Sequence, residues 1–294
     1  SLPDTSNKRG LSLRDILIHQ AGLAAWIPFY KQTLTEDNLL RDTLYSTSYS
    51  DTFSVEVAEG IFLDKQYVDS IFVQIVNSDL RKDTAYKYSD LGYYFFKKMI
   101  EDIQKTPLDS FVSKEFYNPL GLSTLTYLPK NKFEVDRIVP TEFDYYFRSQ
   151  LLEGDVHDMG AAMQGGVGGH AGLFSNANDL GILMQMYLQE GQYAGQRYFK
   201  SKTVNDFTKY QNIKKDNRRG LGFDKPILDG EGGPACDCNP SAEAFGHSGF
   251  TGTLVWADPE EDFVYVFLSN RIHPTAENKK LIENDVRTNI MHVF

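Results

Sequence analysis

The sequence predicts an α+β fold, in which a helical body is followed by an antiparallel sheet that a C-terminal helix covers. Three observations lead to this prediction. Apolar residues recur at helical spacing through much of residues 1–210. Two β-rich runs, 253–256 and 263–268, are joined by a turn that contains Pro259. Residues 275–291 carry a last apolar stripe of helical period, which can cover a sheet face.

A single domain over residues 1–294 is the simplest organisation, mainly helical at 1–210, with the sheet and its C-terminal helix at 211–294. The chain has 294 residues, of which 41% are apolar, and this is enough to bury one substantial core. A two-stranded hairpin is only marginally stable alone. The sheet therefore needs more strands than the sequence plainly offers.

The helical body is predicted from segments with start and stop signals. Ser12 and Asp15 form a capping-box pattern ahead of a first helix that reaches about His19 and is ended by Gly22. The other expected helices are 53–76, one from Ser89 or Asp90 to about Ile103, one that starts at Thr106 and Pro107, and one capped by Ser175 and stopped by Gly191.

Charge and hydropathy exclude two kinds of partner. A formal net charge of −10 opposes a nucleic-acid partner, because that binding depends on clustered Lys and Arg. There is no run of eighteen apolar residues and the first ten residues are polar, so we expect no membrane span and no signal peptide in this sequence. Cys236 and Cys238 are too close for an unstrained disulfide and too few for zinc, which predicts two loop thiols.

Tyr88 stands just before the N-terminus of the helix expected at 89–103. A tyrosine hydroxyl near a helix N-terminus and a cation can be driven toward phenolate, and can then accept a proton from an attacking hydroxyl. Simple packing is the alternative for one of 17 tyrosines. Asp90 accepts but does not donate hydrogen bonds when it is ionised, and its alternative role is to cap the helix.

His247, Ser248, Gly249 and Phe250 are expected at the start of a strand. A protonated His247 can attract a substrate carboxylate, and Gly249 removes a side chain where backbone must approach substrate. The alternative for His247 is a packed or surface histidine.

Several stretches resemble the serine β-lactamase and penicillin-binding-protein superfamily, especially its branch of class C β-lactamases, D-aminopeptidases and esterases. Residues 13–23 resemble the helix and turn that follow the nucleophile helix of that branch. Residues 88–90, Tyr-Ser-Asp, resemble its tyrosine motif, and 247–249, His-Ser-Gly, resemble its Lys-Thr-Gly or His-x-Gly motif. These three stretches follow the family's order, and residues 118–122 and 169–175 are also habitual in the branch.

The resemblance implies a β-lactamase/transpeptidase-like fold and a set of roles. Tyr88 would assist proton transfer, His247 would polarise or position the substrate, and the N–H of Phe250 would be one donor of an oxyanion hole, with Ser248 and Gly249 beside it in substrate binding. Asp90 stands where many relatives have Asn, which puts ordinary β-lactam hydrolysis in doubt. No cofactor and no metal are implied.

The Ser-x-x-Lys motif, which supplies the family's nucleophile and its basic lysine, is not found in these residues. No serine of the sequence is followed three residues later by lysine. The nearest pattern, Thr5-Ser6-Asn7-Lys8, lies in a polar segment, and the family's nucleophile stands well upstream of residues 13–23. Either the chain lacks the N-terminal strands and nucleophile helix, or it is a natural pseudoenzyme. The retained Tyr88 and His247 favour the first explanation.

The resemblance therefore implies a parent serine hydrolase, of β-lactamase, D-alanyl peptidase or esterase type, that acts outside the cytoplasm on a small-molecule or peptidoglycan-derived substrate. The chain alone should not form an acyl-enzyme by this route. The alternatives are a non-catalytic peptidoglycan-binding domain and an accessory domain of a larger glycosidase, because 156–158 and the glycine-rich loop 165–172 resemble members fused behind a family 3 glycoside hydrolase. His157, Asp158, His170 and this loop are interpreted as walls of the cleft, not as metal or nucleotide sites.

Overall fold

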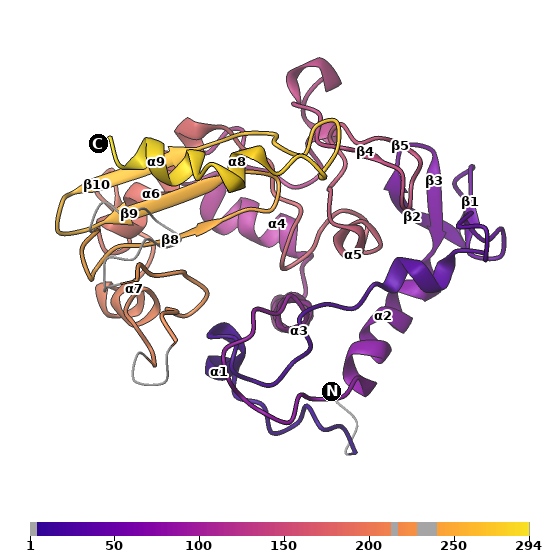
Figure 1. Ribbon diagram of the computed structural model, residues 1–294, viewed down its shortest axis with the longest axis horizontal. Helices are drawn as coiled ribbons and strands as arrows, with labels where there is room; N and C mark the ends of the chain where they lie inside the picture. Colours follow the sequence, from indigo (N-terminus) through magenta and orange to yellow (C-terminus); the bar gives the residue numbers. More distant parts are fainter. Residues whose placement is uncertain (1–4, 213–216, 228–239, 294) are drawn as a thin grey trace. The chain divides into compact units, whose positions relative to one another are not determined.

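The computed structural model describes residues 5–212, 217–227 and 240–293, which form two compact units (Figure 1). Each unit is assembled from separated stretches of the chain. The first comprises Ser1–Val112, Thr126–Phe174 and His273–Thr275, and the second comprises Ser113–Leu125, Ser175–Ile272 and Ala276–Phe294. Cys236 and Cys238 lie outside the described residues. The predicted division of a single domain near residue 210 stays a prediction.

The first unit combines a small antiparallel sheet with helices around one core. The sheet has the strand order β1-β3-β2, and a second antiparallel pair is formed by β4 and β5. Fully buried Leu63, Ile75 and Leu91 bring strand and helices into the same core. The elements are α1 (Leu13–Leu17), β1 (Tyr45–Ser46), β2 (Phe53–Ala58), β3 (Ile61–Asp64), α2 (Lys65–Asn77), α3 (Leu91–Gln104), α4 (Leu108–Val112), β4 (Phe143–Asp144), β5 (Gln150–Leu151) and α5 (Met159–Ala162), with short 3-10 turns at Phe29–Thr33, Pro129–Asn131 and Val135–Arg137.

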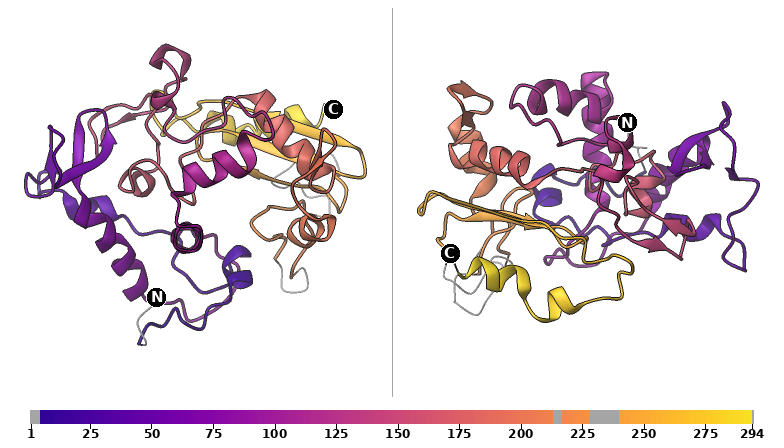
Figure 2. Two further views of the ribbon diagram at one scale, coloured as in Figure 1. Left: turned by 180° about the vertical axis from the view of Figure 1, so that it is seen from behind. Right: turned by 90° about the horizontal axis from the view of Figure 1, so that it is seen from above.

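The second unit is a three-stranded antiparallel sheet, of order β10-β9-β8, between helices (Figure 2). Met184 and Leu188 of α6 pack against Ala257 on one face, whereas Met291 of α9 packs with Trp256 on the other. The elements are a π-helical turn (Ser113–Tyr117), α6 (Ala177–Leu188), β6 (Gln192–Tyr193), β7 (Gln196–Arg197), α7 (Ser201–Thr208), β8 (Phe245–Ser248), β9 (Leu254–Asp258), β10 (Phe263–Phe267), α8 (Lys280–Glu283) and α9 (Val286–Met291).

The structure confirms the α+β class and most of the expected helices, but the helix predicted over 53–76 is wrong in its first half. Residues 53–64 form the hairpin β2–β3, whose turn contains Gly60 at a φ of +67°. The alternation of Phe53, Val55 and Val57 is the period of a strand. Only residues from Lys65 onward are helical, with Asp64 capping α2 through its side chain.

Three boundaries also differ from the prediction. Asn176, and not Ser175, caps α6, because its side chain accepts from the N–H of Asp179. The C-terminal helix is broken into α8 and α9 at Asp285, whose φ is +48°. His247 lies near the end of β8, and not at the start of a strand. In the described part of the chain, no helix is both long and apolar enough to cross a membrane.

Candidate active site

Hydrogen bonds to the turn after α1 hold the Tyr88-Ser89-Asp90 motif in place. The hydroxyl of Ser89 donates to the carbonyl oxygen of Ala24 at 2.6 Å, and its N–H donates to Nδ1 of His19 at 3.2 Å. The N–H of Asp90 donates to the carbonyl oxygen of Ala25 at 3.1 Å. Two stretches that the sequence separates by about 65 residues are thus joined into one rigid turn. The stretch from His19 to Ala25 therefore positions the Tyr88-Ser89-Asp90 motif.

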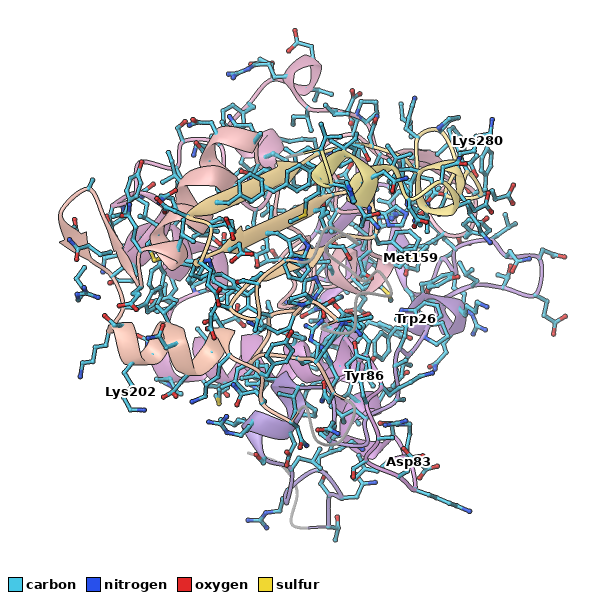
Figure 3. The ribbon with its side chains drawn as sticks, turned by 60° about the vertical axis from the view of Figure 1, so that its left-hand side comes forward. Trp26, Asp83, Tyr86, Met159, Lys202 and Lys280 are labelled. Carbon is cyan, nitrogen blue, oxygen red and sulfur yellow. The ribbon has the colours of Figure 1, made fainter. Side chains whose placement is uncertain are left out.

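Figure 3 marks these two stretches by Trp26 and Tyr86. His19 has a φ of +58°, and its ring centroid lies 4.4 Å from that of Tyr88. Because Nδ1 of His19 accepts a hydrogen bond from an N–H, the ring carries its proton on Nε2. Tyr88 itself is 41% exposed.

Asp90 occupies the N-cap position of α3, but its side chain makes no capping hydrogen bond. The hydroxyl of Ser89 instead accepts from the N–H of Leu91, at 3.2 Å. Asp90 therefore stands at the N-cap position that the alternative assigned to it, but its side chain does not cap the helix. Its carboxyl group is left for another role.

Burial raises the pKa of the Asp90 carboxyl, while His170 lowers it and Asp158 raises it further. His170 and Asp158 form a pair in which Nε2 lies 2.8 Å from Oδ1. The His170 ring stacks on Tyr94 of α3, with centroids 4.5 Å apart, and its side chain is only 3% exposed. Burial alone would raise the pKa of Asp158, but hydrogen bonds and charge from His170 bring it below its ordinary value. The pKa values of two carboxyl groups beside one histidine are thus shifted in opposite directions.

The glycine-rich loop packs directly on the first turn of α3. A Cβ atom at Gly169 would collide with the carbonyl oxygen of Tyr93, and one at Gly160 would collide with the hydroxyl of Tyr94. Only glycine permits this approach of backbone to helix. The close approach of Gly169 to Tyr93 therefore packs the loop against the helix that follows Tyr88.

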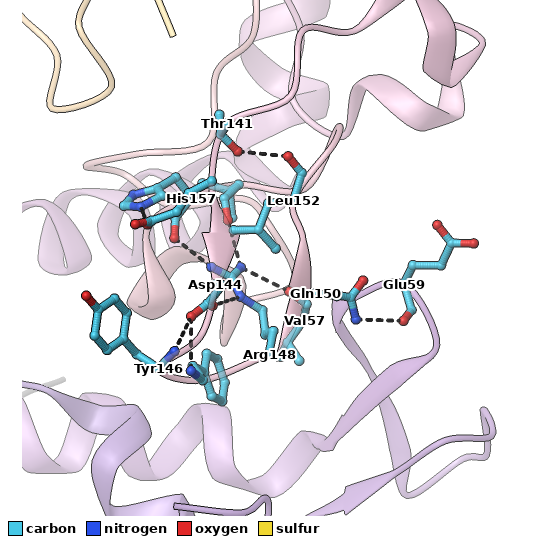
Figure 4. Close-up of polar contacts among 12 residues, drawn as sticks. Val57, Glu59, Thr141, Asp144, Tyr146, Arg148, Gln150, Leu152 and His157 are labelled. Atoms are coloured by element: carbon cyan, nitrogen blue, oxygen red, sulfur yellow. Dashed lines mark hydrogen bonds and ion pairs between the residues drawn. The ribbon is translucent and has the colours of Figure 1, made fainter. Parts of the chain in front are cut away.

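Arg148 is a buried support that no sequence pattern predicts (Figure 4). Its guanidinium donates to Asp144 Oδ2 at 2.6 Å and to the carbonyl oxygens of Val156 and His157 at 2.8 and 2.7 Å. His157 Nε2 in turn lies 2.5 Å from Glu142 Oε2. The partners of Arg148 are irregular segments, which have no periodicity to identify them. The cluster fixes the backbone next to Asp158.

In the second unit, β8 leads into a tight turn built around Gly249. The N–H of Gly249 donates to the carbonyl oxygen of Thr253 at 2.8 Å, and the N–H of Gly252 donates to that of Gly249 at 3.1 Å. A Cβ atom at Gly249 would collide with the hydroxyl of Thr253. Phe250 is 63% exposed, and the Arg271 guanidinium lies 4.8 Å from the centroid of its ring. The turn therefore fixes the backbone of the residues expected to bind substrate.

The predicted site residues fall into two groups. Tyr88 and Asp90 belong to the first unit, where the structure brings them together with His19, Asp158 and His170. His247, Ser248, Gly249 and Phe250 belong to the second unit, at the end of β8. Their catalytic and binding roles stay predictions.

The fold is shared with solved structures of penicillin-binding protein homologues and of a D-stereospecific amidohydrolase. A penicillin-binding protein homologue from Caulobacter crescentus matches with a TM-score of 0.57 and 17% identity, over 91% of this chain and 67% of that one. A penicillin-binding protein homologue from Pyrococcus abyssi matches with a TM-score of 0.57 and 13% identity, over 97% of this chain and 58% of that one. A D-stereospecific amidohydrolase from Streptomyces matches with a TM-score of 0.53 and 16% identity, over 90% and 69%.

The sequence comparison is more specific. A sequence model of the family described as Beta-lactamase matches residues 2–289, and the chain belongs to this family. A protein of Salmonella enteritidis PT4 named "Putative D-alanyl-D-alanine carboxypeptidase" is 36% identical over 211 residues, which are 67% of this chain and 48% of that protein. A protein of the same name from Salmonella typhi matches equally. The match spans about half the length of these relatives.

Proposed function

We propose that this chain carries the proton-transfer and strand portions of a serine acyl-hydrolase site, which acts on D-alanyl peptides or related acyl compounds. The observation that carries the proposal is the rigid Tyr88-Ser89-Asp90 turn, held by His19, Ala24 and Ala25 just before α3. The carboxypeptidase name of relatives that are 36% identical supports this substrate class. The nucleophile would come from residues outside the printed sequence, because no Ser-x-x-Lys occurs within it.

The proposed reaction assigns one task to each group. The hydroxyl of the nucleophilic serine attacks the substrate carbonyl carbon, and its proton passes to the oxygen of Tyr88 as phenolate. The N–H of Phe250 and the nucleophile's own N–H stabilise the negative carbonyl oxygen. The C–N bond then breaks, the leaving amine takes the proton from Tyr88, and water later hydrolyses the ester. Asp90 orients neighbouring groups, while His247, with Ser248 and Gly249, positions the substrate.

A location outside the cytoplasm belongs to the same proposal. Cell-wall peptides that end in D-alanine are found there, and the carboxypeptidase name of the Salmonella relatives supports this class of substrate. The proposed chemistry uses side-chain and backbone groups alone and calls for no cofactor. A fused glycosidase domain and a purely binding role are the outcomes that the experiment below must separate from it.

The test is intact-protein mass spectrometry after incubation with a fluorescent penicillin and a fluorophosphonate. The printed chain is compared with a version extended upstream to the length of its relatives. We expect only the extended version to gain a covalent adduct, and in it Tyr88→Phe should lower the acylation rate by about 10²–10⁴-fold. Tyr146→Phe is the matched control, because Tyr146 is another exposed tyrosine of the same unit.

Three results would count against the proposal in different ways. An adduct on the 294-residue chain without the upstream extension would place the nucleophile among these residues. Equal acylation rates for Tyr88→Phe and the control would remove Tyr88 from the proton transfer. Lack of any adduct on the extended version would favour a peptidoglycan-binding or accessory domain.

A further inference from the structure

Residues 217–227 lie beside β8 and pair with it. None of the sequence motifs includes this segment. Asp224 and Gly246 exchange two backbone hydrogen bonds, at 2.8 and 3.0 Å, as an antiparallel bridge. A Cβ atom at Gly246 would collide with the carbonyl oxygen of Val255 on the neighbouring strand, so only glycine fits here. This bridge places the segment next to His247, the following residue of β8.

Arg219 of this segment is buried against the His247 ring. It is 1% exposed, and its Nη2 lies 3.1 Å from His247 Nε2 and 3.3 Å from the carbonyl oxygen of Gly222. Its Nη1 lies 3.6 Å from Asp224 Oδ1, and Arg218 pairs with the same carboxylate at 3.0 Å. One carboxylate and two guanidinium groups give this cluster a net positive charge next to the imidazole.

These contacts determine which ring nitrogen of His247 carries the proton. A guanidinium can only donate, so Nε2 of His247 must accept from Arg219. A carbonyl oxygen can only accept, so Nδ1, which lies 2.8 Å from the carbonyl oxygen of Ser248, must donate. The two constraints are independent, and they select the same form: a neutral imidazole with its proton on Nδ1.

We propose that Arg219 is a positioning residue of the site, which holds His247 as a neutral, fixed ring so that the ring in turn fixes the carbonyl of Ser248. In this role His247 positions the substrate through the backbone that it orients, and not as a cation that attracts a carboxylate. The Ser248 carbonyl belongs to the peptide group that leads into Gly249 and Phe250. The inference rests on the proposed function for its purpose, but the state of the ring can be measured without any substrate.

The charged groups around His247 agree with the neutral form. Burial lowers the pKa of the imidazole, and the Arg219 and Arg218 guanidinium groups lower it further. The Ser248 carbonyl and the Asp224 carboxylate act in the opposite direction but do not prevail. On the neighbouring strand β9, the residue paired with His247 is Val255, which carries no charge. The ring should therefore remain neutral below the pH at which an ordinary histidine is protonated.

NMR of the imidazole nitrogens, in the 294-residue chain with isotope-labelled histidine, tests the proposal directly. The chain has six histidines, and His247→Gln assigns the signals of His247 by their loss. We expect the neutral ring to carry its proton on Nδ1, with a titration midpoint lower than the ordinary histidine value. A wild-type ring that carries its proton on Nε2, or that titrates at or above the ordinary value, would overturn the proposal.

Two variants separate the charge of Arg219 from its hydrogen bond. Arg219→Gln keeps a donor without the charge, so the Nδ1 form should persist while the midpoint rises toward its ordinary value. Arg219→Met removes both, and the ring should then populate the two neutral forms together. If Arg219→Met does not fold, the wild type and Arg219→Gln still decide the matter. A failure of acylation in the upstream-extended protein, with the Nδ1 form intact, would reject the proposed function and leave this pair standing.

Discussion

Asp90 stands where the family resemblance implies an asparagine in many members, and its surroundings in the structure have a physical consequence. Burial raises the pKa of its carboxyl, and the Asp158 carboxylate adds to this effect. A folded-state pKa above the unfolded value favours folding below the unfolded pKa, and this contribution is lost as the pH rises through the folded pKa. The ionised carboxylate of Asp90 therefore lowers the stability of the folded state at neutral pH.

We expect Asp90→Asn to increase the free energy of unfolding at pH 7. The gain should shrink as the pH is lowered through the raised pKa of the carboxyl, where the wild-type group is itself neutral. Urea unfolding at a series of pH values measures both effects. Asp158→Asn is the contrasting variant, because the His170 pair lowers that pKa, and its loss should destabilise by about 1–3 kcal/mol at pH 7. Destabilisation by Asp90→Asn at neutral pH would contradict this account.

At single residues, the sequence predicted candidate catalytic and binding groups but not the groups that contact and support them. Tyr88 and His247 stand in recognisable motifs with local spacing. Their supports come from elsewhere: His19 is about 70 positions from Ser89, and Arg219 is 28 positions from His247. No periodicity or cap pattern connects such partners, because tertiary contacts alone select them. The sequence also could not predict that Ser89, and not Asp90, accepts the hydrogen bond at the start of α3, since both residue types are good caps.

At the scale of elements, α6 is tied to the segment 113–125 by one buried carboxylate. Asp179, in the first turn of α6, is 2% exposed. It accepts from the N–H and hydroxyl of Thr124, at 2.5 and 2.8 Å, and from the N–H of Leu125 at 3.2 Å. Burial on its own would raise the pKa of this carboxyl, but these donors outweigh it and bring the pKa below its ordinary value. Its contribution is present above the unfolded pKa and is lost as the pH falls through the folded one.

Replacement of this carboxylate leaves three donors without their acceptor. We expect Asp179→Ala to destabilise by about 3 kcal/mol or more at pH 7, because unsatisfied buried donors are expensive. The difference from wild type should narrow in acid, where the wild-type carboxyl is protonated. Asp206→Ala is the control in the same unit, since Asp206 pairs with Lys202 and Lys209 on the exposed side of α7 and should change stability little. Equal effects of the two variants in urea unfolding would refute the role of Asp179.

Elements with strong local signals were predictable, and those defined by pairing were not. The stripe of α3 and the hairpin of β9 and β10 follow from apolar spacing and a turn with Pro259. The third strand, β8, reads Phe-Gly-His-Ser and has no β-branched residue, so its pairing with β9 is what makes it a strand. Residues 53–64 were misassigned because a short apolar run fits both periods, and the decisive feature is the positive φ of Gly60.

At the scale of the molecule, each unit has a hydrophobic core of its own, although the chain passes between the units several times. The core of the first is centred on residues such as Leu63, Leu91 and Met163, and that of the second on clusters around Met186 and Trp256. The network at Tyr88 belongs wholly to the first unit, and the Arg219–His247 pair belongs wholly to the second. Separate cores imply that a local defect is confined, because stability is carried by contiguous cooperative regions.

Hydrogen exchange by mass spectrometry should reveal this confinement. In Gly169→Ala the new methyl group collides with the carbonyl oxygen of Tyr93, which should destabilise the first unit by about 1–3 kcal/mol. We expect faster exchange in α3 and β2–β3, with unchanged protection in α6 and β8–β10, and the reverse pattern for Asp179→Ala. Gly181→Ala is the control for a methyl group added in open space, and in α6 it should slow exchange slightly because alanine favours helix. If both destabilising variants accelerate exchange equally throughout the described segments, the two cores unfold as one cooperative body, and the supports of Tyr88 and of His247 then share a single stability.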